Sequence, residues 1–165
     1  MLTYSIRPIN EEDVPFLWEM LFESLHVRDG QEPFGREVIR EPSLAKYVEG
    51  WGREGDLGYI AVNSEGQSIG SITSRFYKEQ NQGFGFIRHD IPELGMAIIP
   101  EYRGKGIGTA LLSRLFEELA LAGIKQVSLS VDPTNRTAVK LYRRFGFVEA
   151  CMVDTSITMV AYVNG

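Results

Sequence analysis

The residues whose types and spacing suggest chemistry gather in one glycine-rich segment, residues 94–109. An apolar run there stops at Pro100, and helical spacing begins a few residues later. Three alternate glycines separate the two parts: Gly104, Gly106 and Gly108. Such a turn exposes backbone N–H groups that no side chain covers, and the start of a helix adds partial positive charge. With Arg103 and Lys105 beside it, the segment is typical of a phosphate or pyrophosphate site.

Two familiar phosphate motifs do not fit this turn. A P-loop requires G-x-x-x-x-G-K-S/T, but Lys105 is followed by a glycine. The dinucleotide fingerprint G-x-G-x-x-G fails as well, because its last position is Thr109 when counted from Gly104 and Leu111 when counted from Gly106. A structural alternative remains open, in which the glycines only permit a tight turn and close packing of a helix on a sheet.

Two sequence blocks resemble the GNAT superfamily of N-acetyltransferases. Arg103, Gly106 and Gly108 are similar to its coenzyme A signature, R/Q-x-x-G-x-G/A. A second block is similar to the family pattern N-x-x-A-x-x-L/F-Y-x-x-x-G-F, at Asn135, Ala138, Leu141, Tyr142, Gly146 and Phe147. Close resemblance covers residues 93–147, about a third of the chain. The order and separation of the two blocks make the resemblance far more specific than either block alone.

The resemblance implies acetyl-coenzyme A as the acyl-donor cosubstrate. No cluster of His, Cys and Asp has the spacing of metal ligands, so no metal is expected. In that family the pyrophosphate lies on the N–H groups of the turn, which implies contacts from Arg103, Gly104, Lys105, Gly106, Ile107, Gly108 and Thr109. The pantetheine arm pairs like an added strand with the preceding segment, here Met96, Ala97 and Ile98. Asn135 and Tyr142 complete the implied donor site.

The resemblance also implies catalytic roles. The backbone N–H of Ile98 would face the thioester carbonyl and stabilise negative charge there, which one such donor does by about 3 kcal/mol. Tyr142 is the candidate general acid for the departing thiolate, because a phenol with a pKa near 10 keeps its proton at neutral pH. Asn135 lies seven residues earlier, so the two side chains project within roughly 20° of each other on a helix.

The general base is less well marked. In the family it is often a glutamate or a chain of water molecules, and Glu93 stands at the start of the relevant strand. Asp90, His89 and Glu101 are rival candidates, and spacing distinguishes none of them. The residues therefore predict Glu93 as first choice and leave the three others open.

The alternation of strand, glycine turn, helix, strand and helix predicts an α/β core with at least one parallel crossover. We expect strands over residues 3–9, 59–63, 68–77, 94–99, 126–131, 147–152 and 156–163, and helices after Asn10 and over 43–51, 108–122 and 135–145. Apolar residues and serines alternate in 126–131, Asn10 is expected to be a helix N-cap, and Gly123 is expected to be a C-terminal cap. The resemblance implies a mixed α+β fold whose sheet is mostly antiparallel, with six to seven strands, a central splayed parallel pair and about four helices. One domain, residues 1–165, is expected.

Composition narrows the function classes. The net charge is −5 without a dense run of Lys or Arg, which disfavours nucleic-acid binding. No apolar run approaches the roughly 18 to 20 residues of a membrane helix. One cysteine, Cys151, excludes an intramolecular disulfide and is expected to serve packing. The first seven residues lack a signal-peptide pattern, so we expect a cytoplasmic protein.

The predicted function is transfer of an acetyl group from acetyl-coenzyme A to a primary amine, on a small molecule, a peptide or a protein. The alternatives are a bulkier acyl group, or a non-catalytic domain that binds acetyl-coenzyme A as a sensor or interaction module. The resemblance implies an acceptor pocket framed by residues 27–42, which we expect to form a long loop, and by the area of Asp154. An acidic, partly aromatic wall for a cationic amine is expected from Glu32, Glu37, Glu41, Phe34 and Trp51, although an ordinary exposed loop fits these residues as well. A homodimer is possible.

A basic stripe on the last helix adds one further feature, carried by Arg136, Lys140 and Arg143. Two interpretations stand side by side: contact with the 3′-phosphate of the coenzyme, or a solvated helix face.

Overall fold

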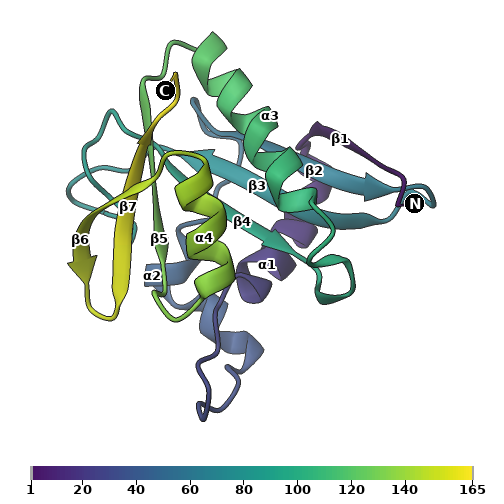
Figure 1. Cartoon of the computed structure of the whole chain (residues 1–165), viewed down its shortest axis with the longest axis horizontal. Helices are drawn as coiled ribbons and strands as arrows, with labels where there is room; N and C mark the ends of the chain where they lie inside the picture. Colours follow the sequence, from purple (N-terminus) through teal and green to yellow (C-terminus); the bar gives the residue numbers. More distant parts are fainter. Residues whose placement is uncertain (1, 165) are drawn as a thin grey trace. The chain divides into compact units, whose positions relative to one another are not determined.

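The computed structural model describes residues 2–164, which form one mixed sheet and four α-helices (Figure 1). The strands are β1 (Tyr4–Pro8), β2 (Leu57–Asn63), β3 (Ser68–Arg75), β4 (Glu93–Ile98), β5 (Gln126–Val131), β6 (Val148–Val153) and β7 (Ser156–Tyr162). The helices are α1 (Val14–Glu23), α2 (Pro42–Ala45), α3 (Ile107–Leu121) and α4 (Arg136–Arg144). Short 3₁₀ segments are Glu11–Asp13, Arg36–Arg40 and Pro100–Tyr102.

The strand order of the sheet is β1-β2-β3-β4-β5-β7-β6. The pairs β1–β2, β2–β3, β5–β7 and β6–β7 are antiparallel, whereas β4 and β5 are parallel. This arrangement confirms the predicted fold class, a mostly antiparallel sheet with one parallel pair and four flanking helices. No helix within residues 2–164 is long and apolar enough to cross a membrane.

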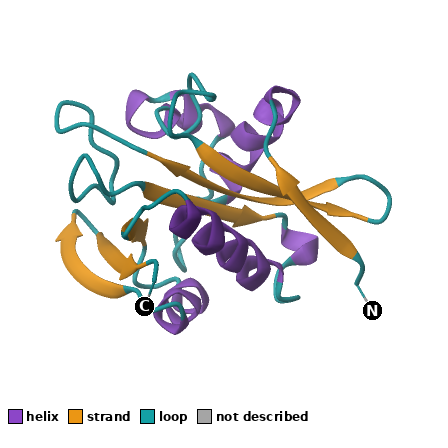
Figure 2. Cartoon of the chain, turned by 90° about the horizontal axis from the view of Figure 1, so that it is seen from above, coloured by secondary structure: helices purple, strands orange, loops and turns teal. Residues whose placement is uncertain are grey.

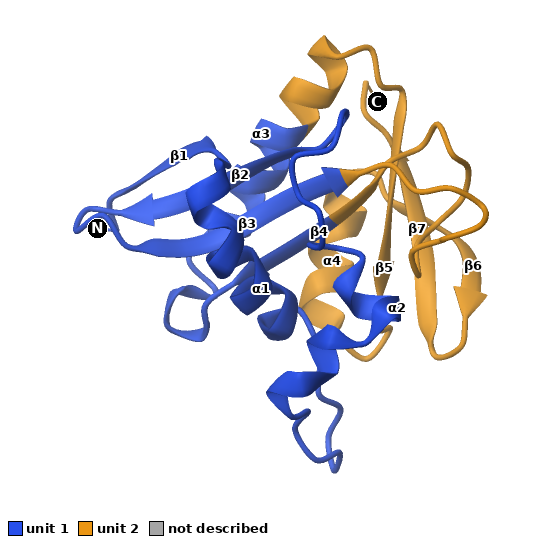
Figure 3. Cartoon of the chain, turned by 180° about the vertical axis from the view of Figure 1, so that it is seen from behind, with its two compact units in different colours: residues 1–74, 95–115 blue, residues 75–94, 116–165 orange. Residues whose placement is uncertain are grey.

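The chain divides into two compact units that alternate along the sequence (Figure 3). Unit 1 comprises residues 1–74 and 95–115, and unit 2 comprises residues 75–94 and 116–165. The boundaries fall within β4 and α3, so neither unit is a continuous stretch of chain. A single domain over residues 1–165 stays a prediction.

A capping box starts the first helical segment of unit 1. The Oδ1 of Asn10 accepts a hydrogen bond from the Glu12 N–H at 2.9 Å, and the Asp13 carboxylate accepts one from the Asn10 N–H at 2.8 Å. Both Asp13 oxygens also accept hydrogen bonds from the Arg7 guanidinium of β1, at 2.7 and 2.8 Å. The predicted cap is therefore confirmed, and it also fixes α1 to the first strand.

Removal of the Asp13 carboxylate should destabilise the fold. Asp13→Ala loses a cap and a bidentate ion pair at a residue that is 6% exposed, so we expect the free energy of unfolding to fall by about 1 to 3 kcal/mol. Arg7, and then the Asn10 N–H, hold the pKa of Asp13 below its usual range. Its stabilisation is therefore present above about pH 4 and is lost as the pH falls. Urea unfolding at pH 7 and pH 3 measures this free energy, with the exposed Asp29→Ala as control. An equal decrease in the free energy of unfolding in both variants would contradict the stabilising role of Asp13.

Helices lie on both sides of the sheet (Figure 2), and strand β2 has a helix against each face within unit 1. Ile60 belongs to an apolar cluster with Leu17 and Leu21 of α1. The guanidinium of Arg114, from α3, lies 4.9 Å from the ring centroid of the neighbouring Tyr59. Because consecutive strand residues point to opposite faces, α1 and α3 cover opposite sides of this strand.

Two predicted elements differ from the structure in the segment after α1. The helix expected over residues 43–51 ends at Ala45, and residues 46–50 continue as turns. There the N–H groups of Tyr47 and Val48 donate three residues back, whereas those of Lys46 and Glu49 donate four residues back. The expected loop over residues 27–42 contains the 3₁₀ segment Arg36–Arg40, in which Ile39 is buried in the α1 cluster. Local spacing did not reveal either feature, because both depend on tertiary packing.

Unit 2 is centred on β5, β7 and β6, with α4 held by aromatic side chains. The Phe116 ring meets the rings of Phe145 and Phe147 edge-on, with centroids 5.5 and 5.9 Å apart. Strand β6 forms the edge of the sheet, and five of its six residues are exposed. The expectation that Cys151 serves packing is wrong for this reason, since the residue is exposed on that edge.

Candidate functional site

The glycine turn of unit 1 presents a run of open backbone donors. Within residues 2–164, no group accepts a hydrogen bond from the backbone N–H groups of residues 104–109. The first four N–H groups of any helix lack partners inside the helix, and here the preceding turn adds more. The turn and the start of α3, a helix of 15 residues, therefore form a cradle for an anion with several oxygens.

Glycine is required for this backbone. Gly104 and Gly106 have φ values of +74° and +85°, in the left-handed region that other residues rarely adopt. A Cβ built on either residue would have no atom within 4 Å, so the glycines leave open space in front of the donors. Close packing therefore does not explain these two glycines, because no atom of the described chain lies within 4 Å of the position a Cβ would take.

Arg103 braces the turn. Its Nε donates to the Ile98 carbonyl at 2.9 Å, and its Nη2 forms an ion pair with the Glu23 carboxylate of α1 at 3.2 Å. Its backbone N–H donates to the Pro100 carbonyl. The donors that remain available to a ligand therefore begin at Gly104, while Lys105 is exposed beside them.

Strand β4 orients the donor expected at Ile98. The Ile99 N–H donates to the Ile69 carbonyl of β3 at 3.0 Å. Because successive N–H groups along a strand point to opposite edges, the N–H groups of Ile98 and Met96 face away from β3, whereas that of Ala97 faces toward it. The parallel pairing of β4 with β5 is recorded at one position, Glu93 with Ser128. The splay expected between these two strands stays a prediction.

The candidate bases differ sharply in their surroundings. Glu93 is 4% exposed at the start of β4. Asp90 is exposed and bound to the Arg88 guanidinium at 2.9 Å, which holds the pKa of its carboxyl below the usual range. His89 and Glu101 are exposed. Glu93 is thus the one buried residue among the four candidates, and its role as general base stays a prediction.

Ser128 is a candidate site residue that the sequence alone did not indicate. It is fully buried and lies in register with Glu93, so the two side chains share one face of the sheet. No described residue supplies a hydrogen-bond partner for its Oγ. The alternation of apolar residues with serines in residues 126–131 did not indicate burial of the serine, but Ser128, Val127 and Leu129 are all buried. A serine in a strand that is covered on both faces is the signal that would have identified it.

The second sequence block lies in unit 2, on α4. Asn135 is the N-cap of that helix and accepts a hydrogen bond from the Ala138 N–H at 3.4 Å. Tyr142 is 7% exposed and meets the Phe147 ring edge-on, with centroids 5.7 Å apart. Burial raises the pKa of the Tyr142 hydroxyl to about 12. The phenol therefore keeps its proton at any pH at which the protein would work.

This pKa predicts a specific alkaline instability. The folded chain binds the phenolic proton more tightly than the unfolded chain, so the contribution of Tyr142 is intact below about pH 10 and is lost as the pH rises toward 12. The total loss is about 3 kcal/mol, at 1.36 kcal/mol for each pKa unit. Urea unfolding between pH 9 and 11.5 should show a steeper loss in the wild type than in Tyr142→Phe. Parallel curves would contradict the burial of this hydroxyl.

The described part of the chain offers little to a metal ion. No group of three or more His, Cys, Asp or Glu residues within residues 2–164 could hold one. The open donors of residues 104–109 are all N–H groups, which bind anions and not cations.

Comparison with known proteins gives a consistent result. The model of the acetyltransferase (GNAT) family matches residues 17–147. An uncharacterized N-acetyltransferase of Methanocaldococcus jannaschii is 25% identical over 160 residues, which is 96% of this chain and 66% of the relative. The ribosomal protein bS18-alanine N-acetyltransferase of Escherichia coli is 40% identical over 55 residues, 33% of this chain and 37% of the relative. The chain spans two thirds or less of the length of these curated relatives.

Solved structures share the fold. The crystal structure of the ribosomal-protein-S18-alanine N-acetyltransferase from Escherichia coli has a TM-score of 0.67 at 20% identity, covering 98% of this chain and 94% of that one. A spermidine/spermine N-acetyltransferase from Vibrio cholerae has a TM-score of 0.63 at 18% identity, covering 98% and 96%.

Proposed function

The chain belongs to the acetyltransferase (GNAT) family of acyltransferase enzymes, and on that premise we propose that it transfers an acetyl group from acetyl-coenzyme A to a primary amine. One observation carries the proposal: the open N–H groups of residues 104–109, which suit the linked phosphates of the coenzyme. The coenzyme would supply the acetyl group as an activated thioester.

Unit 1 would hold the donor through backbone groups. The N–H groups from Gly104 to Thr109 bind the pyrophosphate, and the exposed Lys105 adds positive charge. The outward edge of Met96 to Ile98 offers strand-like hydrogen bonds to the amides of the pantetheine arm. The Ile98 N–H stabilises the negative charge that develops on the acetyl oxygen.

Tyr142 would assist the departing sulfur. With a pKa of about 12 its hydroxyl is much less acidic than a thiol, whose reference pKa is about 8.5. Complete proton transfer to a thiolate is therefore uphill from the resting state. The role that fits this pKa is hydrogen-bond donation to the sulfur as its charge develops.

Glu93 would accept the proton of the attacking ammonium, with the Ser128 hydroxyl positioned beside it. We expect Glu93→Gln to lower kcat/KM and to remove the acid limb of its pH profile, because the amide cannot take up a proton. Asp90→Asn, which alters an exposed carboxylate nearby, is the matched control. The thermal midpoint of each variant must be checked first, since Glu93 is buried. An unchanged pH profile in a folded Glu93→Gln protein would remove Glu93 from the mechanism.

The acceptor is proposed as a small amine or an amine of a peptide or protein. One similar structure is named for acetylation of an alanine of ribosomal protein S18, and another for acetylation of spermidine and spermine. These two names cover a protein amine and small amines. In the acceptor wall expected from the sequence, Glu32, Glu37 and Glu41 are all exposed, which suits a cationic amine. Phe34 and Trp51 are partly buried.

Release of free thiol from acetyl-coenzyme A, measured with a panel of polyamines, amino acids and peptides, tests the proposal. Thermal unfolding with coenzyme A, acetyl-coenzyme A, NAD and ATP runs beside it, and a ligand at a hundredfold its Kd should raise the midpoint by about 5 to 10 °C. A shift with the two coenzyme A species plus amine-dependent thiol release supports transfer. A shift without such release favours the sensor alternative, and no shift at millimolar ligand refutes the donor site.

A further inference from the structure

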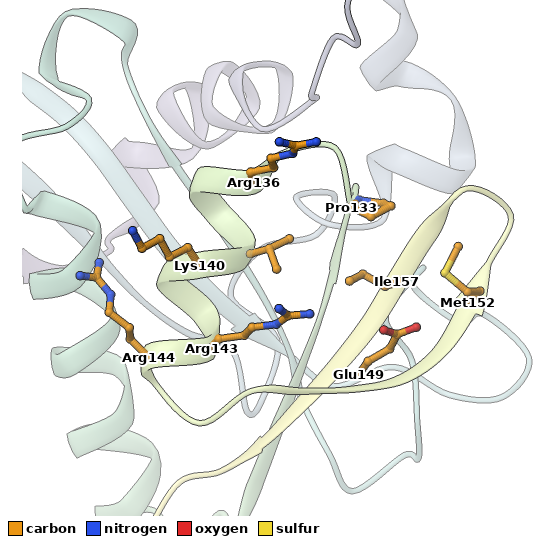
Figure 4. Close-up of a pocket in the computed structure, with 9 residues that line it drawn as sticks. Pro133, Arg136, Lys140, Arg143, Arg144, Glu149, Met152 and Ile157 are labelled. Atoms are coloured by element: carbon orange, nitrogen blue, oxygen red, sulfur yellow. The ribbon is translucent and has the colours of Figure 1, made fainter.

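A groove in unit 2 lies outside every residue assigned to the donor site or to catalysis (Figure 4). Its volume is about 870 Å³, and it runs between α4 and the strands β6 and β7. The lining residues are Pro133, Arg136, Val139, Lys140, Arg143, Arg144, Glu149, Met152 and Ile157. This volume is at the upper end of the range of ligand pockets, and it accommodates several side chains at once.

The charge of the groove is opposite to that of the chain. Four of the nine lining residues are cations and one, Glu149, is an anion, whereas the whole chain has a net charge of −5. Within residues 2–164, none of the four cations forms a salt bridge. Arg136, Lys140 and Arg144 follow at intervals of four residues, and like charges at this spacing destabilise a helix. The helix retains this positive charge without internal compensation.

Figure 4 shows how the cations are arranged. The Arg143 guanidinium extends from α4 toward the strands, on the side of Glu149, whereas the tips of Lys140 and Arg144 extend from the other side of the helix. Arg136 lies seven residues before Arg143, so both leave the helix in nearly the same direction. These two arginines are therefore the principal contacts for an anionic group in the groove.

The groove also has apolar surface and an open strand beside it. Val139, Met152 and Ile157 contribute apolar side chains, and Met152 is 53% exposed on the edge strand β6. A strand at the edge of a sheet presents unpaired backbone groups to which an extended chain can add. A phosphate backbone would leave these apolar side chains without partners, whereas the side chains of a peptide can contact them.

We propose that this groove binds an extended acidic segment of a partner protein, whose carboxylates meet Arg136 and Arg143 and whose apolar side chains contact Val139 and Met152. Carboxylates pair with guanidinium groups in bidentate geometry, which accounts for two arginines at the centre of the site. The proposal does not depend on the acetyl-transfer chemistry, because it uses none of the residues assigned to that reaction.

Fluorescence anisotropy of a labelled ten-residue peptide of alternating Glu and Leu, titrated with the full chain, tests the proposal. We expect saturable binding that weakens as salt concentration rises. The double variant Arg136→Glu/Arg143→Glu should weaken binding at least tenfold. The matched control Lys78→Glu/Lys125→Glu makes the same charge change at two exposed lysines of unit 2 outside the groove, and should bind like the wild type.

Four outcomes would overturn the proposal. The first is equal weakening in the control variant, which indicates general charge attraction. The second is an RNA oligonucleotide of equal charge that binds as tightly as the peptide. The third is displacement of the peptide by coenzyme A, which assigns the cations to the donor. The fourth is binding unaffected in both Arg136→Gln/Arg143→Gln and Met152→Asp, two milder variants that keep the test valid if charge reversal unfolds the chain.

Discussion

Tyr142→Phe is expected to fold like the wild type and to lose about 100-fold in kcat, with little change in the KM for acetyl-coenzyme A. The substitution deletes one hydroxyl at a residue whose ring is held edge-on against Phe147, so the packing of α4 is preserved. The pKa of about 12 keeps this hydroxyl protonated, so its loss removes a donor at every accessible pH. Steady-state thiol release from pH 6 to 9 should show the same fold loss throughout.

A matched variant separates this effect from a general loss of tyrosine hydroxyls. Tyr162→Phe removes an equivalent group from a residue that is 66% exposed on β7, and it should retain full turnover. Near-wild-type kcat for Tyr142→Phe would exclude the hydroxyl from the reaction. A loss confined to KM would instead assign the residue to donor binding.

The second large effect is expected at the glycine turn. Gly106→Asp places a carboxylate among the open N–H donors, where it competes with the phosphates and repels them. We expect the KM for acetyl-coenzyme A to rise about 100-fold or more, which corresponds to roughly 3 kcal/mol of binding. Gly106 has a φ of +85° and open space beyond its Cα, so the added side chain projects outward and does not clash.

Gly106→Asn is the control for Gly106→Asp, because asparagine has the same shape without the charge and tolerates a positive φ. It should raise KM only several-fold and lower the thermal midpoint as much as aspartate does. If the two variants raise KM equally, the turn acts through its backbone shape, and the placement of phosphate at these donors would be wrong.

Much of the fold could be predicted where local signals act alone. Asn10 caps its helix as its position indicated, and β5 spans residues 126–131 as the alternation predicted. Gly123, expected as a helix cap, has a φ of +78° directly after α3. The structure of the segment after α1 was not predicted, because it depends on the packing of Ile39 against other elements. Nothing in residues 27–42 alone encodes that contact.

The residues of the candidate site likewise differ in how far the sequence predicted them. The glycine turn could be predicted from the sequence, because its backbone needs glycine and its charged residues and glycines are close together in the chain. Ser128 was not, because its importance comes from burial on both faces of β5 and from its register with Glu93. The basic stripe on α4 was visible in the sequence, but the groove beside it requires β6 and β7 to be placed. Pairings between distant segments are what a single sequence does not display.

The ion pair between Arg103 and Glu23 makes the donor turn sensitive to events at the end of α1. One guanidinium fastens three segments of unit 1: the last turn of α1, the end of β4 and the start of the glycine turn. The segment proposed to face the acceptor amine begins at residue 27, four residues after Glu23. If the proposed donor and acceptor sites hold, an acceptor that moves this helix end would alter the ion pair, and binding of the two substrates would then be coupled. Each would bind with an affinity that depends on whether the other is present.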